Sequence, residues 1–488
     1  MNIPEEVKKI MTLLSDSGFE AYAVGGCVRD SIMGKDPDDW DLATNASPEK
    51  IQSLFKEKGF KVFYENDFGT VGIVLLENKK RKFSNIVEIT TYRTETDYSN
   101  NRHPDSVQWA TTIEEDLSRR DFTVNSIAVG KEGNIIDPYN GRSDITKKII
   151  KAVGDPEERF NEDILRIFRA VRFASTLDFS IEEKTLFSIK KNASKIDDIS
   201  KERIRVELVK ILMSRRAMNG IDLLREVGIL KYIIPEIIEG YGVAQNKHHI
   251  YDCYWHNLYA LDYAAKKDFN FYVRLSALLH DVAKPAVKVG EGDNATFYNH
   301  EVVGEKMTIK IMYRLKFSKK EIEKVSRLVR YHLFYYNVDE VTESSVRRLV
   351  RQVGKDNIDD LIKLRMCDRI GSGVPKAKPY KLRHLQYLID KISQDPLSVK
   401  MLAIKGDDIM RILELKSGPK IGWILSILFN IVLSDPTKNS KDFLEEKVIE
   451  LGGLTDKDLK IKFQKANDGI NHIALKNDQM IKKRYWVK

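Results

Sequence analysis

The spacing of apolar residues changes once along this chain, and that change limits the folds open to it. Before about residue 140 the apolar residues form short runs of the kind found in strands, such as AYAVGG, FGTVGIVLLEN, NIVEITTYR and TVNSIAVG. From Ile145 onward they recur every three or four residues, as in ERFNEDILRIFRAVRFAS and KERIRVELVKILMS, which is typical of amphipathic helices. The pattern predicts an α+β fold, with a mixed β-sheet and helices first and an all-α remainder.

The chain has 488 residues, too many for one compact core. Segments rich in Gly, Pro and Asp near 137–144, 288–294 and 370–380 are plausible joints. We therefore expect four parts, a head over 1–140, a helical neck over 141–215, a helical body over 216–375 and a helical tail over 376–488.

Composition says little about the partners of the chain but more about its cellular location. The 81 Lys and Arg exceed the 72 Asp and Glu by nine, which fits a polyanionic partner and fits an ordinary soluble basic surface about equally well. Three widely spaced cysteines indicate neither a disulfide framework nor a structural zinc site. The first 19 residues resemble an amphipathic helix rather than a signal peptide, and the apolar run Ile421 to Leu433 is too short to cross a bilayer. A cytoplasmic location is expected.

Two aspartates follow a glycine pair near the start of the chain. Asp39 and Asp41 are separated by one residue, so on a strand both carboxylates face the same side, where Mg²⁺ could bind. Gly25 and Gly26 precede a predicted helix, where backbone N–H groups can approach a triphosphate, and Arg29 could hold that phosphate. Taken alone, a pair of aspartates at this spacing is more often a solvated turn.

Joined as GGCVRDSIMGKDPDDWDLAT, the segment resembles the signature of polymerase-β-like nucleotidyltransferases. The resemblance is to the class II group, which contains CCA-adding enzymes and bacterial poly(A) polymerases. It implies that Asp39 and Asp41 hold two Mg²⁺ ions, one activating the primer 3′-hydroxyl and the other stabilising pyrophosphate. Glu88, on a second apolar strand, is the candidate third carboxylate, and a strand-edge surface charge is the alternative.

The segment SRRDFTVNSIA resembles the next motif of that family. The resemblance implies that Arg120, Asp121 and Asn125 hold ribose and phosphate. Asp121 and Asn125 lie four residues apart, so they could instead only cap a helix. The following DPYNGRSDI resembles the connector between head and neck.

In EDILRIFRAVRFAS four charged residues recur at three-residue intervals, which on a helix form one polar stripe. They are Asp163, Arg166, Arg169 and Arg172. The segment resembles the family's base-selecting motif, and this implies that Asp163 and Arg166 pair with the edge of C or A while Arg169 and Arg172 contact phosphate. A salt-bridged helix face is the plainer alternative.

Residues 91–109 form a polar segment rich in turn-forming residues, and we expect a mobile loop there. CCA-adding members of the family carry a loop at this place that is shortened in members adding only CC. The resemblance therefore favours addition of the terminal A as well.

Six of the nine histidines lie between His248 and His332, and among them is the pair His280–Asp281. This part resembles the HD phosphohydrolase superfamily. The resemblance implies a divalent metal, of the Mn, Ni, Fe or Mg kind, bound by His256, His280, Asp281 and Asp368. The alternative is a helical body that no longer hydrolyses anything and only binds tRNA.

These resemblances imply an enzyme that adds C, C and A to the 3′ end of tRNA from CTP and ATP. It would contact the acceptor and T arms, with no DNA or membrane partner. GPKIG, Gly418 to Gly422, could start a helix that holds a tRNA phosphate. Partial addition, poly(A) synthesis, an HD phosphohydrolase with a nucleotide-binding head, and a non-catalytic RNA-binding protein are the alternatives.

Overall fold

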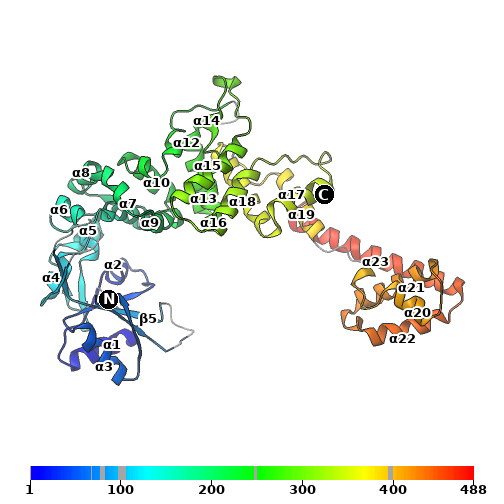
Figure 1. Cartoon of the computed structure of the whole chain (residues 1–488), viewed down its shortest axis with the longest axis horizontal. Coiled ribbons are helices and arrows are strands. Elements are labelled where there is room, and N and C mark those ends of the chain that lie inside the picture. The colour runs from blue at the N-terminus through cyan, green and yellow to red at the C-terminus, as the bar shows by residue number, and fades with distance from the viewer. Residues whose placement is uncertain are drawn as a thin grey trace. The chain divides into compact units, whose positions relative to one another are not determined.

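The computed structural model of the chain describes residues 2–66, 69–76, 78, 83–96, 106–246, 250–393 and 399–487. Contacts divide it into two compact units. The first comprises Met1–Leu333 with Lys363–Pro375, and the second Phe334–Ile362 with Lys376–Lys488. Figure 1 follows the whole chain from the head to the C-terminal helices.

The head contains a mixed β-sheet, as the sequence predicts, and the structure shows that this sheet has seven strands. Its order is β3-β4-β5-β2-β1-β8-β9, and β2 pairs with β5 in parallel while the other neighbours are antiparallel. The strands are β1 (Tyr22–Val24), β2 (Trp40–Thr44), β3 (Lys61–Asn66), β4 (Thr70–Val74), β5 (Ile86–Thr91), β8 (Ala128–Gly130) and β9 (Ile135–Ile136). A separate hairpin joins β6 (Arg93–Thr96) to β7 (Ser106–Trp109), and residues 97–105 of the predicted loop lie outside the described part of the chain.

The two faces of this sheet have different roles. Trp40 and Leu42 of β2 belong to the main apolar core, which also contains residues of α1 (Glu5–Asp16) and α3 (Pro48–Glu57). Ala43 belongs instead to a second core with Leu117 of α4 (Ile113–Ser118). Because side chains alternate along a strand, Asp41 lies on the same face as Ala43 and away from the main core.

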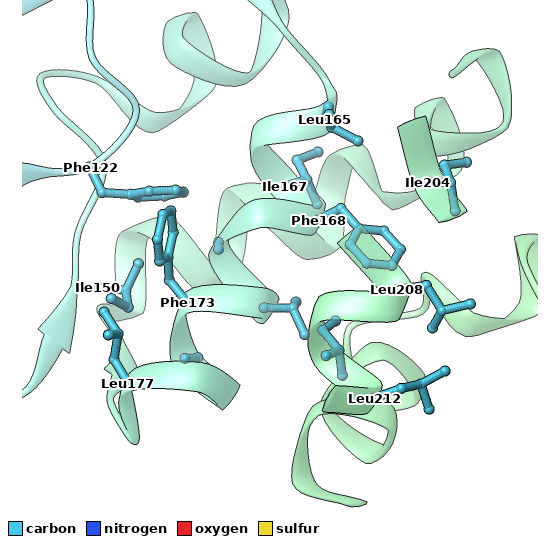
Figure 2. Close-up of a cluster of buried hydrophobic side chains, with 14 of the residues drawn as sticks. Phe122, Ile150, Leu165, Ile167, Phe168, Phe173, Leu177, Ile204, Leu208 and Leu212 are labelled. Atoms are coloured by element: carbon cyan, nitrogen blue, oxygen red, sulfur yellow. The ribbon is translucent and has the colours of Figure 1, made fainter. Parts of the chain in front are cut away.

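The neck packs its helices directly on the head, and Figure 2 shows their shared core. Phe122 of the head meets Phe173 edge to face, with ring centroids 5.7 Å apart. Phe168 lies further along the same cluster, near Leu208. The neck elements are α5 (Gly141–Lys147), β10 (Ile149–Ile150), α6 (Pro156–Glu162), α7 (Leu165–Leu177), β11 (Ser180–Ile181), α8 (Glu183–Asn192), α9 (Lys201–Met213) and α10 (Ala217–Glu226).

The body that follows is helical. In it α12 packs on α13, and α16 packs on both α13 and α15. Its main helices are α11 (Pro235–Ile238), α12 (Cys253–Lys266), α13 (Phe271–Leu279), α14 (Lys284–Val287), α15 (His300–Arg314), α16 (Lys319–Tyr331) and α18 (Ile358–Gly371). His248 and His249, which the sequence does not single out for a role, lie outside the described residues.

The second unit is also helical. Its core is formed by α20, α21, α22 and α23, and the predicted helix start at GPKIG is confirmed because α21 begins at Pro419. Its helices are α17 (Glu343–Val353), α19 (Tyr380–Ser393), α20 (Gly406–Ile412), α21 (Pro419–Ser434), α22 (Lys441–Gly452) and α23 (Asp456–Tyr485). Among the described helices none is both long and apolar enough to cross a membrane.

The shared core of head and neck yields a stability prediction. Phe168→Ala empties a fully buried position, and loss of a buried phenyl ring costs about 3–5 kcal/mol. Phe187→Ala on α8 is the matched control, because this ring is 72% exposed and its loss is expected to cost less than about 0.5 kcal/mol. Guanidinium unfolding of both variants checks this, and equal losses would contradict the proposed core.

Candidate active sites

Two of the three predicted carboxylates, Asp41 and Glu88, lie on one face of the head sheet, whereas Asp39 precedes β2 and so does not share a strand with Asp41 as expected. Asp41 on β2 lies directly opposite Glu88 on the neighbouring parallel strand β5, and opposite Val24 of β1 on its other side. Asp39 lies in the bend just before β2, two residues from Asp41, and is exposed. The strand register thus brings together residues that are about fifty positions apart in sequence. This register places Glu88 beside Asp41, a position that the residues around Glu88 in the sequence do not predict.

Gly25 leaves open the space beside these carboxylates. It has a positive φ of 76° and precedes α2 (Gly26–Ile32). A Cβ atom at this position would lie 3.0 Å from Nη1 of Arg120 and 3.8 Å from Oδ2 of Asp41. Asp116, itself buried, accepts from Nη2 of Arg120 at 3.0 Å and holds that side chain in place. A glycine is therefore required by both backbone conformation and space.

Arg29, Asn125 and Asp121 form a chain of hydrogen bonds. Nη1 of Arg29 donates to Oδ1 of Asn125 at 2.8 Å, and Nδ2 of Asn125 donates to Oδ1 of Asp121 at 3.2 Å. All three side chains are nearly buried. The alternative that Asp121 and Asn125 only cap a helix is wrong, because Phe122 is the N-cap of the short 3₁₀ turn here, and no side chain caps it.

The same chain of contacts continues into the neck. Oδ2 of Asp121 accepts from Nε of Arg169 at 2.8 Å. Burial alone would raise the pKa of Asp121, but the charge and hydrogen bond of Arg169 lower that pKa to about 2. Nη1 of Arg169 lies 4.0 Å from Oε1 of Glu207, whose Oε2 lies 2.6 Å from Nε of Arg172. Arg169 and Arg172 are thus both paired with buried carboxylates.

Glu207 is a residue that the sequence reasoning missed. It is 4% exposed and lies on α9 between Ile204 and Ile211, both fully buried. An acidic residue in the apolar stripe of an amphipathic helix is the signal that could have found it, since buried carboxylates require cationic partners.

The predicted polar stripe in the neck is wrong at its first member. Asp163 does not lie on α7 but between α6 and α7 in an extended conformation. Its Oδ1 accepts from the backbone N–H of Leu165 at 3.0 Å, which favours a helix break at this residue. Its Oδ2 accepts from Nη2 of Arg203 at 2.8 Å, a second partner that the sequence did not reveal.

Arg166 lies in the first turn of α7 and is nearly buried. Its Nη1 donates to the backbone oxygen of Arg159 at 3.0 Å and contacts Glu162. Its Nη2 donates to the backbone oxygen of Arg119 at 3.0 Å, within the SRRD segment of the head. Arg166 therefore connects the candidate base-selecting segment of the neck to the SRRD segment of the head, which contains the candidate ribose-binding residues.

A second cluster lies in the helical body, where four predicted residues meet. Nε2 of His256 lies 2.9 Å from Nε2 of His280, 3.0 Å from Oδ2 of Asp281 and 3.5 Å from Oδ1 of Asp368. Two further histidines complete it, with Nε2 of His300 and of His332 at 3.3 Å and 3.4 Å from Oδ1 of Asp281. All six side chains are buried, and neutral imidazole with carboxylate is a donor set that suits divalent transition metals.

Lys284 also contacts this cluster. Its Nζ lies 2.6 Å from Oδ2 of Asp281 and donates to Oε1 of Gln245 at 2.6 Å. Burial alone would raise the pKa of Asp281, but Lys284 and the surrounding imidazoles hold that pKa well below its usual range. Asp281 is thus a carboxylate in the folded chain.

Comparison with known families matches three segments of the chain. Residues 21–151 match the poly A polymerase head domain, residues 178–240 match the probable RNA and SrmB-binding site of polymerase A, and residues 256–372 match the HD domain. The polymerase-β-like head and the helical HD body that the sequence predicted are thereby confirmed. The four predicted domain limits stay predictions.

Individual relatives agree with these matches. A CCA-adding enzyme of Lactococcus lactis is 43% identical over 234 residues, which is 47% of this chain and 56% of that protein. One of Enterococcus faecalis is 44% identical over 222 residues, which is 45% of this chain and 52% of that protein. The chain thus matches about half the length of these curated relatives.

A solved structure matches over most of the chain. It is the Bacillus stearothermophilus CCA-adding enzyme in complex with CTP, which is 27% identical with a TM-score of 0.60. The match covers 92% of this chain and 98% of that one.

The Asp121–Arg169 pair predicts an acid-sensitive stability. A pKa of about 2 in the folded chain against 3.8 for an unperturbed aspartate corresponds to roughly 2 kcal/mol. Because the folded pKa is depressed, this stabilisation is present above about pH 4 and is lost as the pH falls through about 2.

Asp121→Asn should therefore lower the free energy of unfolding by at least roughly 2 kcal/mol at pH 7, since Arg169 also loses its partner. The deficit relative to wild type should narrow by about pH 3. Urea unfolding of both proteins at several pH values measures it. If the loss in free energy of unfolding did not change with pH, the ion pair between Asp121 and Arg169 could not be its source.

Proposed function

We propose that this chain, a member of the class II tRNA nucleotidyltransferase and poly(A) polymerase family with an HD domain, adds C, C and A to the 3′ end of tRNA. CTP and ATP would supply the nucleotides and pyrophosphate would be released. The observation that carries this proposal is the register of Asp41 against Glu88 beside Gly25 and Arg120. The CCA-adding enzymes among its relatives support addition of CCA over poly(A) synthesis.

In the proposed reaction the tRNA 3′-hydroxyl attacks the α-phosphorus of the incoming nucleotide. A new phosphorus–oxygen bond forms, the bond from the α-phosphorus to pyrophosphate breaks, and the hydroxyl proton passes to water. Oxygen ligands on one face are what Mg²⁺ prefers, and Asp39, Asp41 and Glu88 supply them. Two bound Mg²⁺ ions would activate the hydroxyl and neutralise charge on the phosphates.

The residues around the carboxylates would hold the nucleotide. Arg120 lies beside both Gly25 and Asp41, so we assign it to the triphosphate, which can approach the backbone at Gly25 and Gly26. Arg29 and Asn125 would contact triphosphate and ribose. Asp121 would keep Asn125 and Arg169 in position through its hydrogen bonds to both.

The neck would choose the base. The Asp163 carboxylate can accept from the exocyclic amino group of C or A, while the Arg166 guanidinium donates to ring acceptors, and G and U present the wrong pattern. Arg203, which bonds to Asp163, would orient that carboxylate. Arg169 and Arg172, expected from sequence to contact phosphate, would do so only from within their ion pairs with Asp121 and Glu207.

A second function is favoured by the cluster in the HD body. We propose that His256, His280, Asp281 and Asp368 bind a divalent metal that supports phosphohydrolase activity. Both activities would take place in the cytoplasm, since the three cysteines form no disulfide. The tail, with the helix that begins at Pro419, would bind the tRNA body.

Asp41→Ala should abolish nucleotide incorporation into tRNA, because the sheet-face carboxylate that binds metal is lost. Binding of tRNA should change less than about threefold, since the phosphate contacts that carry affinity are elsewhere. Single-nucleotide gels with labelled CTP and ATP, and filter binding of tRNA, measure the two effects. Asp38→Ala is the matched control, an exposed neighbour outside β2, and equal loss in both variants would refute the assignment.

Arg166→Ala should relax the choice among nucleotides more than it weakens tRNA binding. Arg159→Ala is the control, because it also removes a contact with Glu162 but not the proposed base reader. Competition of GTP and UTP with CTP and ATP measures the choice. If a folded Arg166→Ala protein selected nucleotides as the wild type does, Arg166 would not be the residue that selects the base.

A further inference from the structure

We propose that the second unit carries a nucleotide-binding site of its own, in which the indole of Trp486 stacks on the base and the surrounding cations hold the phosphate. The site lies at the end of α23, in a different unit from the nucleotide-binding residues of the head. Such a nucleotide is either free in solution or an unpaired member of an RNA strand, and both present the same base and phosphate. The inference does not depend on the reaction proposed for the head.

A cavity of about 390 Å³ lies where the end of α23 meets α19 and the segment that precedes α19. Its lining residues are Lys376, Lys378, Arg383, Arg484, Tyr485 and Trp486. Cations and aromatic rings make up this lining, and among the described residues no carboxylate contributes to it. Pockets for small molecules have volumes of about 300–1,000 Å³, so the cavity suits a single nucleotide.

The backbone at Trp486 is held in place while its ring faces solvent. Nη1 of Arg383, on α19, donates to the backbone oxygen of Trp486 at 2.9 Å, and the next residue, Val487, is buried. Trp486 ends α23 in a left-handed conformation with a φ of 54°, and it is 79% exposed. A large ring that is anchored at its backbone and open on its face can stack with a base of any identity.

The cations of the cavity are only partly balanced by carboxylates. Arg383 donates from Nη1 to the backbone oxygens of Tyr485 and Trp486, which carry no net charge. Arg484 does contact a carboxylate, with Nη1 at 3.2 Å from Oδ2 of Asp390, but the Tyr485 hydroxyl donates to the same oxygen at 2.7 Å. The lining of the cavity therefore carries a positive excess.

Lys378 lies among these like charges. Its Nζ is 5.5 Å from the centre of the Tyr485 ring. Burial lowers the pKa of Lys378, and the charges of Arg383 and Arg484 lower it further, although Asp359 acts in the opposite direction. An anion in the cavity would relieve this repulsion, and a phosphate group can accept hydrogen bonds from several cations at once. Cations beside an exposed aromatic ring match the phosphate and the base of a nucleotide.

This cavity is separate from the helix start at Pro419, which the proposed function assigns to the tRNA body. Trp423 of α21 packs against Phe463 of α23, with ring centroids 6.2 Å apart. A rise of about 1.5 Å per residue places Tyr485 about 33 Å from Phe463 along the same helix. The two sites can therefore be tested separately.

The test is a ¹⁹F NMR titration of the full chain, labelled with 5-fluorotryptophan, with guanosine monophosphate in the absence of Mg²⁺. The chain has five tryptophans, and Trp486→Phe identifies the signal of Trp486. Guanosine monophosphate is the probe because the head is proposed to reject G, and Trp40, between Asp39 and Asp41, reports separately on the head. We expect the Trp486 signal to shift and to saturate with one nucleotide bound.

Lys378→Ala should weaken this binding at least about tenfold, because a charge-assisted contact with the phosphate is lost. Lys483→Ala is the matched control, an exposed lysine in the last turn of α23 that does not line the cavity. Its loss should change binding less than about twofold, since solvent and salt screen an exposed charge. Guanosine and inorganic phosphate, each offering one half of the ligand, should each bind at least about tenfold more weakly than the nucleotide.

A single-stranded RNA of four nucleotides identifies the source of the ligand. Binding of this RNA at least as tight as that of guanosine monophosphate would assign the site to RNA strands, and a response to the mononucleotide alone would assign it to free nucleotides. The proposal would be overturned if both left the Trp486 signal unchanged, or if inorganic phosphate or phosphatidylglycerol vesicles shifted it as strongly. The wild-type titration decides even if Lys378→Ala fails to fold, and a negative result leaves the reaction of the head untouched.

Discussion

Asp121 is a buried carboxylate shared between the head and the neck, and much of the head site depends on its charge. It accepts hydrogen bonds from Asn125 of the head and Arg169 of the neck. Removing one member of such a buried pair leaves the other charge unpaired, at a cost of about 3–5 kcal/mol. Glu207 repeats this arrangement one step further, between Arg169 and Arg172. Arg29 and Asn125 of the head are thus connected to Arg169 and Arg172 of the neck by one chain of hydrogen bonds and ion pairs.

The chain carries two clusters of metal-binding residue types, and their chemistry differs. The head offers carboxylate oxygens at a partly open sheet face, the hard ligands that suit Mg²⁺ and its retained water. The HD body offers buried imidazoles with two carboxylates, which bind transition metals more tightly. The two clusters therefore need not compete for the same ion, and each can be tested without the other.

Several features of the fold and of the head site can be predicted from the sequence because they depend on residues only a few positions apart. The spacing of Asp39 and Asp41, the glycine before α2 and the change from strand to helix periodicity all act over a few residues. Pairings across the fold are not readable in this way. The register of Asp41 against Glu88, the partner of Asp163 and the position of Glu207 are set by how strands and helices pack. The predicted stripe was wrong at Asp163 because its side chain bonds to the backbone of Leu165 and interrupts the helix.

CCA addition is tested by incubation of the purified chain and Mg²⁺ with three tRNA transcripts, one lacking CCA, one lacking only the terminal A and one complete. Each receives labelled CTP, ATP or both, and products are separated at single-nucleotide resolution. If the chain adds CCA, the first transcript gains C, C and A and stops, the second gains A, and the third is unchanged. A product that ends at CC, or an extending ladder of A, would contradict CCA addition, and no incorporation at all would contradict the head as a transferase.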